Sequence, residues 1–223
     1  MSFLFNPANY DLTDPSSIPN LLVQHLIIVG IAMAFSLVIA IPLGILVARY
    51  RRIYFPVITI TGLAYTIPSM AFLAFLVSIP VAFLELNPPT IIIPLVVYNQ
   101  LVLIRNTATG INSVDPLLIE VGRAMGLTRW QILWRVTLPL AMPIIVAGIR
   151  VATVTTIGIA AISTLVGVDS LGDLIFLGFE NANNGQLIAG AILISLLAIF
   201  ADLLLLSLQV ALNRGRTIAS ATA

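Results

Sequence analysis

The sequence predicts an all-α integral membrane protein with about five transmembrane helices. Of its 223 residues, 60% are hydrophobic and only 9% are charged, and the mean hydropathy is +1.11. Soluble globular domains carry about 25% charged residues. Several apolar stretches also reach the roughly 20 residues that a helix needs to cross the hydrocarbon core of a bilayer. Composition and run length together place the chain among integral membrane proteins.

Five windows with few or no charged residues are the expected membrane spans. They are Leu21–Ala48, Phe55–Leu84, Leu86–Ile104, Met142–Val168 and Leu187–Leu212. The second window contains Pro68, which removes a backbone donor and is expected to kink the helix. The fourth and fifth windows are apolar except for Arg150 and Asp202.

The arginines predict how the chain is oriented in the membrane. All ten basic residues are arginine, and clusters follow the first span (Arg49, Arg51, Arg52) and the fifth span (Arg214, Arg216). Five spans put these two clusters on the same side, and basic residues are enriched on the cytoplasmic side. We therefore expect the N-terminus outside and the C-terminus inside. The expected organisation is an external lead-in at residues 1–20, a transmembrane domain at 21–216 and a cytoplasmic tail at 217–223.

Several classes of function find no support in the sequence. It has no cysteine and a single histidine, His25, so no catalytic or metal-binding cluster of those residues is expected. It has no lysine and no Walker A pattern, so the chain is not expected to bind ATP itself. The net charge of +1 gives no reason to expect a nucleic-acid partner. No clustered catalytic groups of the kind that intramembrane enzymes need are present, and no catalytic residue is assigned.

Between the third and fourth spans, the sequence carries the signals of two short amphipathic helices. Asp115 followed by Pro116 is typical of a helix start. Gly126 suits a left-handed helix stop, and Thr128 with Gln131 forms the pattern of a capping box. The expected result is two helices joined at a sharp glycine bend.

This segment, residues 113–139, has two interpretations that remain open on physical grounds. The second helix is expected to end at Leu138-Pro139, where it leads into the fourth span. In one interpretation the helices lie on the lipid surface, with Trp130 and Trp134 as interfacial anchors. In the other, a rigid apolar knob docks into a groove on a cytoplasmic partner.

The spacing of the segment resembles the "EAA" signature of ABC importer permeases. Glu120 is followed by Gly126 and then by Val136-Thr-Leu-Pro at the distances of that signature, although Val121 and Gly122 stand where alanine is usual. The resemblance implies a coupling helix that sits in a cleft of an ATPase subunit. The residues that the resemblance assigns to ATPase coupling are Glu120, Val121, Gly122, Arg123, Met125, Gly126, Leu138 and Pro139.

A wider likeness covers about residues 21–212. The stretches TGLAYTIPSMAFLAFL, PLVVYNQLVLIRNTATGINSVDPLLIEVGRAMG and LPLAMPIIVAGIRVATVTTIGIAAISTLVG resemble the permeases of glycine betaine, carnitine and choline importers. The outer loop GVDSLGD departs from the glycine-richer pattern of that family. The likeness implies a type I ABC importer permease fold in a bacterial or archaeal cytoplasmic (inner) membrane.

The same likeness implies a set of partners. They are ABC ATPase subunits that bind ATP and Mg, a second permease chain, identical or paralogous, and an external substrate-binding protein. No cofactor is expected in this chain. The alternatives are an ABC importer for another small solute, such as an amino acid, and an ATPase-independent carrier or channel.

A quaternary ammonium substrate suggests candidates for the translocation pathway. Such a cation has no hydrogen-bond donor and is best held by aromatic faces. The candidate pathway residues are Tyr65, Pro68, Phe72, Phe75, Tyr98 and Asn99. Tyr65 and Phe72 are expected on one helix face because they lie seven residues apart. Packing between helices is the alternative for the aromatic residues, and interhelical hydrogen bonding is the alternative for Asn99.

Arg150 and Asp202 are the two charged residues expected within spans. Counted from the cytoplasmic ends of their spans, they lie at about 13 Å and about 15 Å. Ionisable residues at such depth are costly and are usually paired or functional. The matched depths predict an ion pair between the fourth and fifth spans, with a place in the inner vestibule as the alternative.

Overall fold

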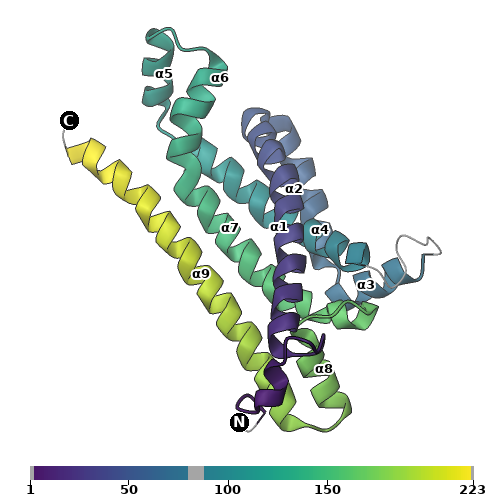
Figure 1. The fold of residues 1–223 in the computed structure, drawn as a ribbon. Helices are drawn as coiled ribbons and strands as arrows, with labels where there is room; N and C mark the ends of the chain where they lie inside the picture. Colours follow the sequence, from purple (N-terminus) through teal and green to yellow (C-terminus); the bar gives the residue numbers. More distant parts are fainter. Residues whose placement is uncertain (1–2, 80–87, 222–223) are drawn as a thin grey trace.

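The computed structural model describes residues 3–79 and 88–221, and its regular elements there are all helical (Figure 1). The longer helices are α1 (Ile18–Arg49), α2 (Arg51–Thr66), α4 (Pro88–Asn112), α7 (Leu138–Ala160) and α9 (Asn184–Ala221). The shorter elements are η1 (Pro7–Tyr10), α3 (Ser69–Val77), α5 (Pro116–Ala124), α6 (Arg129–Ile132), the π-helical turn η2 (Leu133–Thr137), η3 (Ala161–Val166) and α8 (Gly172–Glu180).

The helices agree with the expected membrane spans in number. Four stretches of the described chain are long and apolar enough to cross a membrane, and the pair α2 and α3 makes a fifth if it counts as one broken span. The helix α4 runs past Arg105 as far as Asn112, so the third span extends beyond its charge-free window. Residues 80–84 of the expected second span lie outside the described residues.

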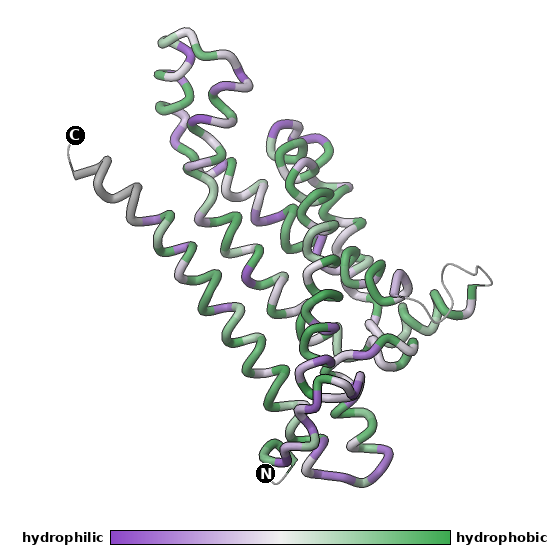
Figure 2. Tube along the Cα trace, viewed as in Figure 1, coloured by the Kyte–Doolittle hydropathy of each residue, from purple (hydrophilic) through white to green (hydrophobic). Residues whose placement is uncertain are grey.

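The two ends of the bundle differ in the elements and chain termini that lie there. Figure 1 places the N-terminus and α8 at one end, and the α5–α6 hairpin and the C-terminus toward the other. Figure 2 shows hydrophobic residues along the long helices and hydrophilic residues gathered near both ends. This arrangement is the one that an odd number of spans produces.

The core of the bundle runs through α1, α4 and α7, which pack in that order, while α9 packs on α7 and α8. Glycines bring the first three helices close together. A β carbon at Gly44 of α1 would lie 2.5 Å from Thr107 Cβ of α4, and one at Gly148 of α7 would lie 2.5 Å from Asn106 Cβ. Small residues at such crossings let helix backbones approach, which is how helices associate where lipid replaces water.

The expected second span is not one kinked helix but two helices that meet at 86°. α2 ends at Thr66, and Ile67 and Pro68 both have extended backbone conformations, with ψ of 125° and 134°. The proline ring disfavours the helical conformation for the residue before it, which explains why the chain leaves the helix at Ile67.

The outer loop forms the short helix α8, which packs on α9. Leu171 and Leu174 of this loop are buried, while Phe179 is 75% exposed. Asp173 at the start of α8 accepts a hydrogen bond from Thr164, and burial raises the pKa of Asp173 against the opposing effect of that bond. α8 is thus held to η3 as well as to α9.

The close crossing of α4 and α7 predicts different outcomes for two glycines of the same helix. Gly148→Ala should lower the free energy of unfolding, because its new methyl group must displace Asn106, at a cost of about 1–3 kcal/mol. Gly158→Ala is the matched control, since nothing lies within 4 Å of its β carbon position. Thermal unfolding of the purified variants in detergent measures both, and equal midpoints would contradict the packing described.

Candidate functional site

The first helix of the α5–α6 hairpin is capped at both ends. Asp115 accepts a hydrogen bond from the Leu117 N–H at 2.9 Å, as the sequence predicted for a helix start. At the other end the Leu127 N–H donates to the Gly122 carbonyl at 3.0 Å, and the Gly126 N–H donates to the Arg123 carbonyl at 2.9 Å. These two bonds form a Schellman motif, and it requires the left-handed conformation that Gly126 adopts with φ of +80°.

The second helix begins with the predicted capping box and packs directly against the first. The Gln131 N–H donates to the Thr128 hydroxyl, and the Gln131 side chain accepts from the Thr128 N–H. Gly122 is buried, and a β carbon there would lie 3.4 Å from Ile132 Cγ1. The hairpin is therefore closed by a glycine bend and by contact between its two helices.

The prediction that the second helix ends at Leu138-Pro139 is wrong. The chain continues from α6 through the π-helical turn η2 into α7, and the Leu138 N–H donates to the Leu133 carbonyl. The wider turn accommodates Pro139, which has no N–H and whose ring would press on the preceding turn of an ordinary α-helix. Leu138 is buried beside Ala141 and Ile145. The hairpin is consequently continuous with α7.

The apolar side chains of the hairpin are largely exposed in the isolated chain. Met125 is 75% exposed, Trp130 66% and Leu117 61%. Glu120 and Arg123 of α5 are also exposed. An exposed apolar face on a capped element is typical of a surface that another protein or the lipid covers.

The aromatic candidates in the broken span converge on Tyr98 of α4. The Tyr65 and Phe72 rings each lie 6.0 Å from the Tyr98 ring, edge to face, and the Tyr98 hydroxyl donates to the Ile67 carbonyl at 2.7 Å. Tyr65 and Phe72 lie on α2 and α3, so the bend, rather than a shared helix face, brings them together. Phe75 is outside this contact and is 62% exposed.

Two of the candidate pathway residues are buried inside the chain. Tyr98 is 3% exposed and Asn99 is 2% exposed. The Asn99 amide donates to Ser36 Oγ of α1 at 3.1 Å and to Thr156 Oγ1 of α7 at 2.9 Å. Asn99 is therefore an interhelical link and does not line an open surface of this chain. Tyr65, Pro68 and Phe75 are exposed.

Arg150 and Asp202 join α7 to α9. The guanidinium and the carboxylate form two hydrogen bonds, of 2.9 and 2.8 Å, and a third bond of 2.8 Å runs from Arg150 to the Gln209 side chain. Sequence reasoning did not identify Gln209. Its position seven residues after Asp202 puts it on the same face of α9, and that spacing was the available signal.

The helices define a membrane protein with a capped hairpin at one end of its bundle, and comparison with known proteins gives the family. Residues 40–218 match the family described as "Binding-protein-dependent transport system inner membrane component". The chain belongs to this family, so the prediction of a transporter subunit rather than an enzyme is confirmed.

Two curated relatives are similar over most of their length. The chain is 42% identical to the carnitine transport permease protein OpuCD of Listeria monocytogenes, over 92% of this chain and 91% of that one. It is 44% identical to the glycine betaine/carnitine/choline transport system permease protein OpuCD of Bacillus subtilis, over 85% and 82%. The resemblance to osmoprotectant permeases is therefore confirmed.

The fold is also similar to a solved structure. A chain of the inward-facing MetNI methionine ABC transporter matches with a TM-score of 0.75 at 23% identity, over 85% of this chain and 93% of that chain. The expected fold, that of a type I ABC importer permease, is confirmed by this likeness.

The pairing of Arg150 with Asp202 predicts a non-additive response to mutation. Arg150→Gln and Asp202→Asn should each lower the midpoint of thermal unfolding in detergent, because each leaves one charge without its partner between α7 and α9. The double variant should be more stable than the sum of the two effects predicts. Asp169→Asn, on the exposed outer loop, is the control and should change little. Strict additivity would show that the two side chains act independently.

Proposed function

We propose that this chain is the permease subunit of an ATP-driven importer for glycine betaine, choline, carnitine or a related quaternary ammonium compound. The observation that carries the proposal is the α5–α6 hairpin. It is a double-capped element with an exposed apolar face, it is continuous with α7, and its glycine bend stands at the signature position of ABC importer permeases. A force applied to such an element reaches the membrane helices without being absorbed by a flexible loop.

In this proposal the hairpin docks into an ATPase subunit through Glu120 and the exposed apolar residues of α5. ATP and Mg are bound by the ATPase. Closure of the ATPase dimer moves the hairpin and α7 together, and the bundle changes between inward- and outward-facing packings. Gly126 sets the bend, Gly122 holds it against Ile132, and Leu138 anchors its base. A second permease chain, identical or paralogous, completes the pathway, and an external binding protein delivers the substrate.

The proposed substrate class is supported by the relatives and by the aromatic residues of the broken span. The names of both OpuCD proteins include carnitine, and the Bacillus name adds glycine betaine and choline. These compounds share a trimethylammonium group, which aromatic faces attract. Tyr65 and Phe75 are 42% and 62% exposed, so their rings are available to a pathway formed with a second chain. Tyr98 packs edge to face against the Tyr65 ring.

The proposed orientation has the N-terminus outside and the hairpin in the cytoplasm. It follows from the arginines after the first span and in the hairpin, because arginine is enriched on the cytoplasmic side. The termini and the hairpin occupy the ends of the bundle that this orientation requires (Figure 1).

The proposed function predicts substrate-dependent ATP hydrolysis by the assembled complex. Reconstituted with its ATPase and binding protein, the permease should support hydrolysis that rises on adding glycine betaine, choline or carnitine. Methionine and histidine are the controls and should give no stimulation. Stimulation by methionine or histidine, without stimulation by the quaternary ammonium compounds, would contradict the proposed substrate class and favour an amino-acid importer. The proposed coupling to an ATPase would not be contradicted by that result.

The coupling role predicts that hairpin variants lose ATPase contact without unfolding. Gly126→Ala places a side chain at φ +80°, which strains the bend by about 1–2 kcal/mol. Glu120→Gln removes a charge from the docking face. Both should reduce co-purification of the ATPase, while Glu180→Gln, an exposed carboxylate on α8, should not. Full retention of the ATPase by both hairpin variants would refute the contact.

The absence of cysteine makes orientation directly measurable. Met125→Cys should react with a membrane-impermeant thiol reagent in inside-out vesicles only, and Phe179→Cys in right-side-out vesicles only. Both native side chains are 75% exposed, so accessibility within the chain is matched. The reverse labelling pattern would place the hairpin outside the cell and exclude the coupling role.

A further inference from the structure

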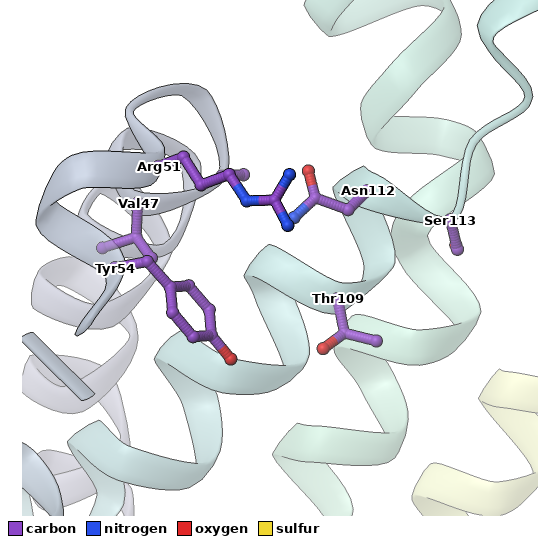
Figure 3. A pocket seen from close by; sticks show the side chains of 7 residues that line it. Val47, Arg51, Tyr54, Thr109, Asn112 and Ser113 are labelled. Carbon is purple, nitrogen blue, oxygen red and sulfur yellow. The ribbon is translucent and has the colours of Figure 1, made fainter. Parts of the chain in front are cut away.

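A cavity of about 590 Å³ lies at the hairpin end of the bundle, apart from the hairpin and the aromatic cluster. It is formed where α1 ends, α2 begins and α4 approaches its C-terminus (Figure 3). Its polar lining is Arg51, Tyr54, Thr109, Asn112 and Ser113, and Val47 contributes an apolar wall. Cavities of this size are typical of small-molecule sites.

The polar groups around this cavity have hydrogen-bonding capacity to spare. Figure 3 shows the Arg51 guanidinium and the Asn112 side chain pointing toward one another across it. Within the described residues, the side chains of Arg51, Tyr54, Thr109 and Asn112 make no side-chain hydrogen bond, and the one ion pair is elsewhere. The Ser113 hydroxyl donates to the Gly110 carbonyl at 2.8 Å.

The charge of the cavity selects an anion. Arg51 lines it, no acidic residue does, and Arg49 and Arg52 adjoin it in sequence. A guanidinium donates two parallel hydrogen bonds to the oxygens of a phosphate or carboxylate, and tyrosine, threonine and asparagine supply further donors. The cavity also lies at the end of a membrane-spanning helix, which is the level of lipid headgroups.

We propose that this cavity binds a phosphate-bearing anion, supplied by the headgroup of an anionic phospholipid. The phosphate accepts hydrogen bonds from Arg51 and from the Tyr54, Thr109 and Asn112 side chains. The volume beyond the phosphate, beside Val47, accommodates the glycerol of the lipid.

Occupancy of the site would connect two elements that move in the proposed function. Arg51 is the first residue of α2, which leads to the break at Pro68. Asn112 is the last residue of α4, just before Asp115 starts the hairpin. A bound phosphate bridges these residues, so it links the broken span to the base of the hairpin.

The test is native mass spectrometry of the complete transporter with dioleoyl phosphatidylglycerol, dioleoyl phosphatidylcholine or inorganic phosphate. Phosphatidylglycerol should be retained over phosphatidylcholine. Arg51→Gln should weaken that retention about tenfold, the effect of losing a charge-assisted hydrogen bond. The matched control Arg52→Gln removes the same charge from the neighbouring residue, which does not line the cavity.

The outcomes separate the sources of the phosphate. Arg51-dependent retention of phosphatidylglycerol supports the proposal, and Arg51-dependent binding of inorganic phosphate alone supports the anion site with a soluble source. Equal losses of phosphatidylglycerol retention for Arg51→Gln and Arg52→Gln would show that general surface charge causes the retention. That result would overturn the site. Retention of neither phosphatidylglycerol nor inorganic phosphate would also overturn it. So would retention of phosphatidylcholine equal to that of phosphatidylglycerol. Wild-type-like gel filtration of both variants shows that loss of binding is not loss of folding.

Discussion

The lack of water inside a bilayer is the constraint on which this structure depends. A polar group there must find its partner within the protein, because lipid offers none. The bundle meets this requirement at separate places: Asn99 binds across α1, α4 and α7, the Tyr98 hydroxyl binds a backbone carbonyl freed by the break in the second span, and Arg150 binds Asp202 across α7 and α9. Each interaction holds together helices that have no hydrophobic driving force between them.

Some polar and apolar groups of the described residues remain without partners inside the chain. Several such groups lie near the hairpin end of the bundle, where Met125 and Trp130 are exposed on the hairpin and Arg51 borders an open cavity. The hairpin is rigid because its glycine bend is closed by backbone bonds and because it continues through a π-helical turn into α7. Rigidity and exposure together suit a mechanical contact better than a segment resting on lipid, since a lipid-bound segment needs no fixed connection to a membrane helix.

The sequence predicted the features that depend on a few neighbouring residues. It did not predict those that depend on packing between helices. The cap at Asp115, the left-handed Gly126 and the capping box at Thr128 depend on a few neighbouring residues, so their pattern alone predicted them. Matched depth along two spans was enough to predict that Arg150 faces Asp202. The second helix of the hairpin does not end at Leu138-Pro139, because the π-helical turn η2 accommodates the proline. No local sequence pattern indicates that turn. The burial of Tyr98 and Asn99 likewise depends on neighbouring helices, which their own sequence positions do not specify.

The central claim of the proposed mechanism is that the α5–α6 hairpin is driven by a separate nucleotide-hydrolysing subunit. Uptake of radiolabelled glycine betaine into proteoliposomes, with the binding protein supplied and the ATPase either present or omitted, tests this claim most directly. The proposed mechanism predicts accumulation against a gradient when the ATPase and ATP are present, and no uptake above protein-free liposomes when the ATPase is absent. Equal uptake by the permease alone would contradict it.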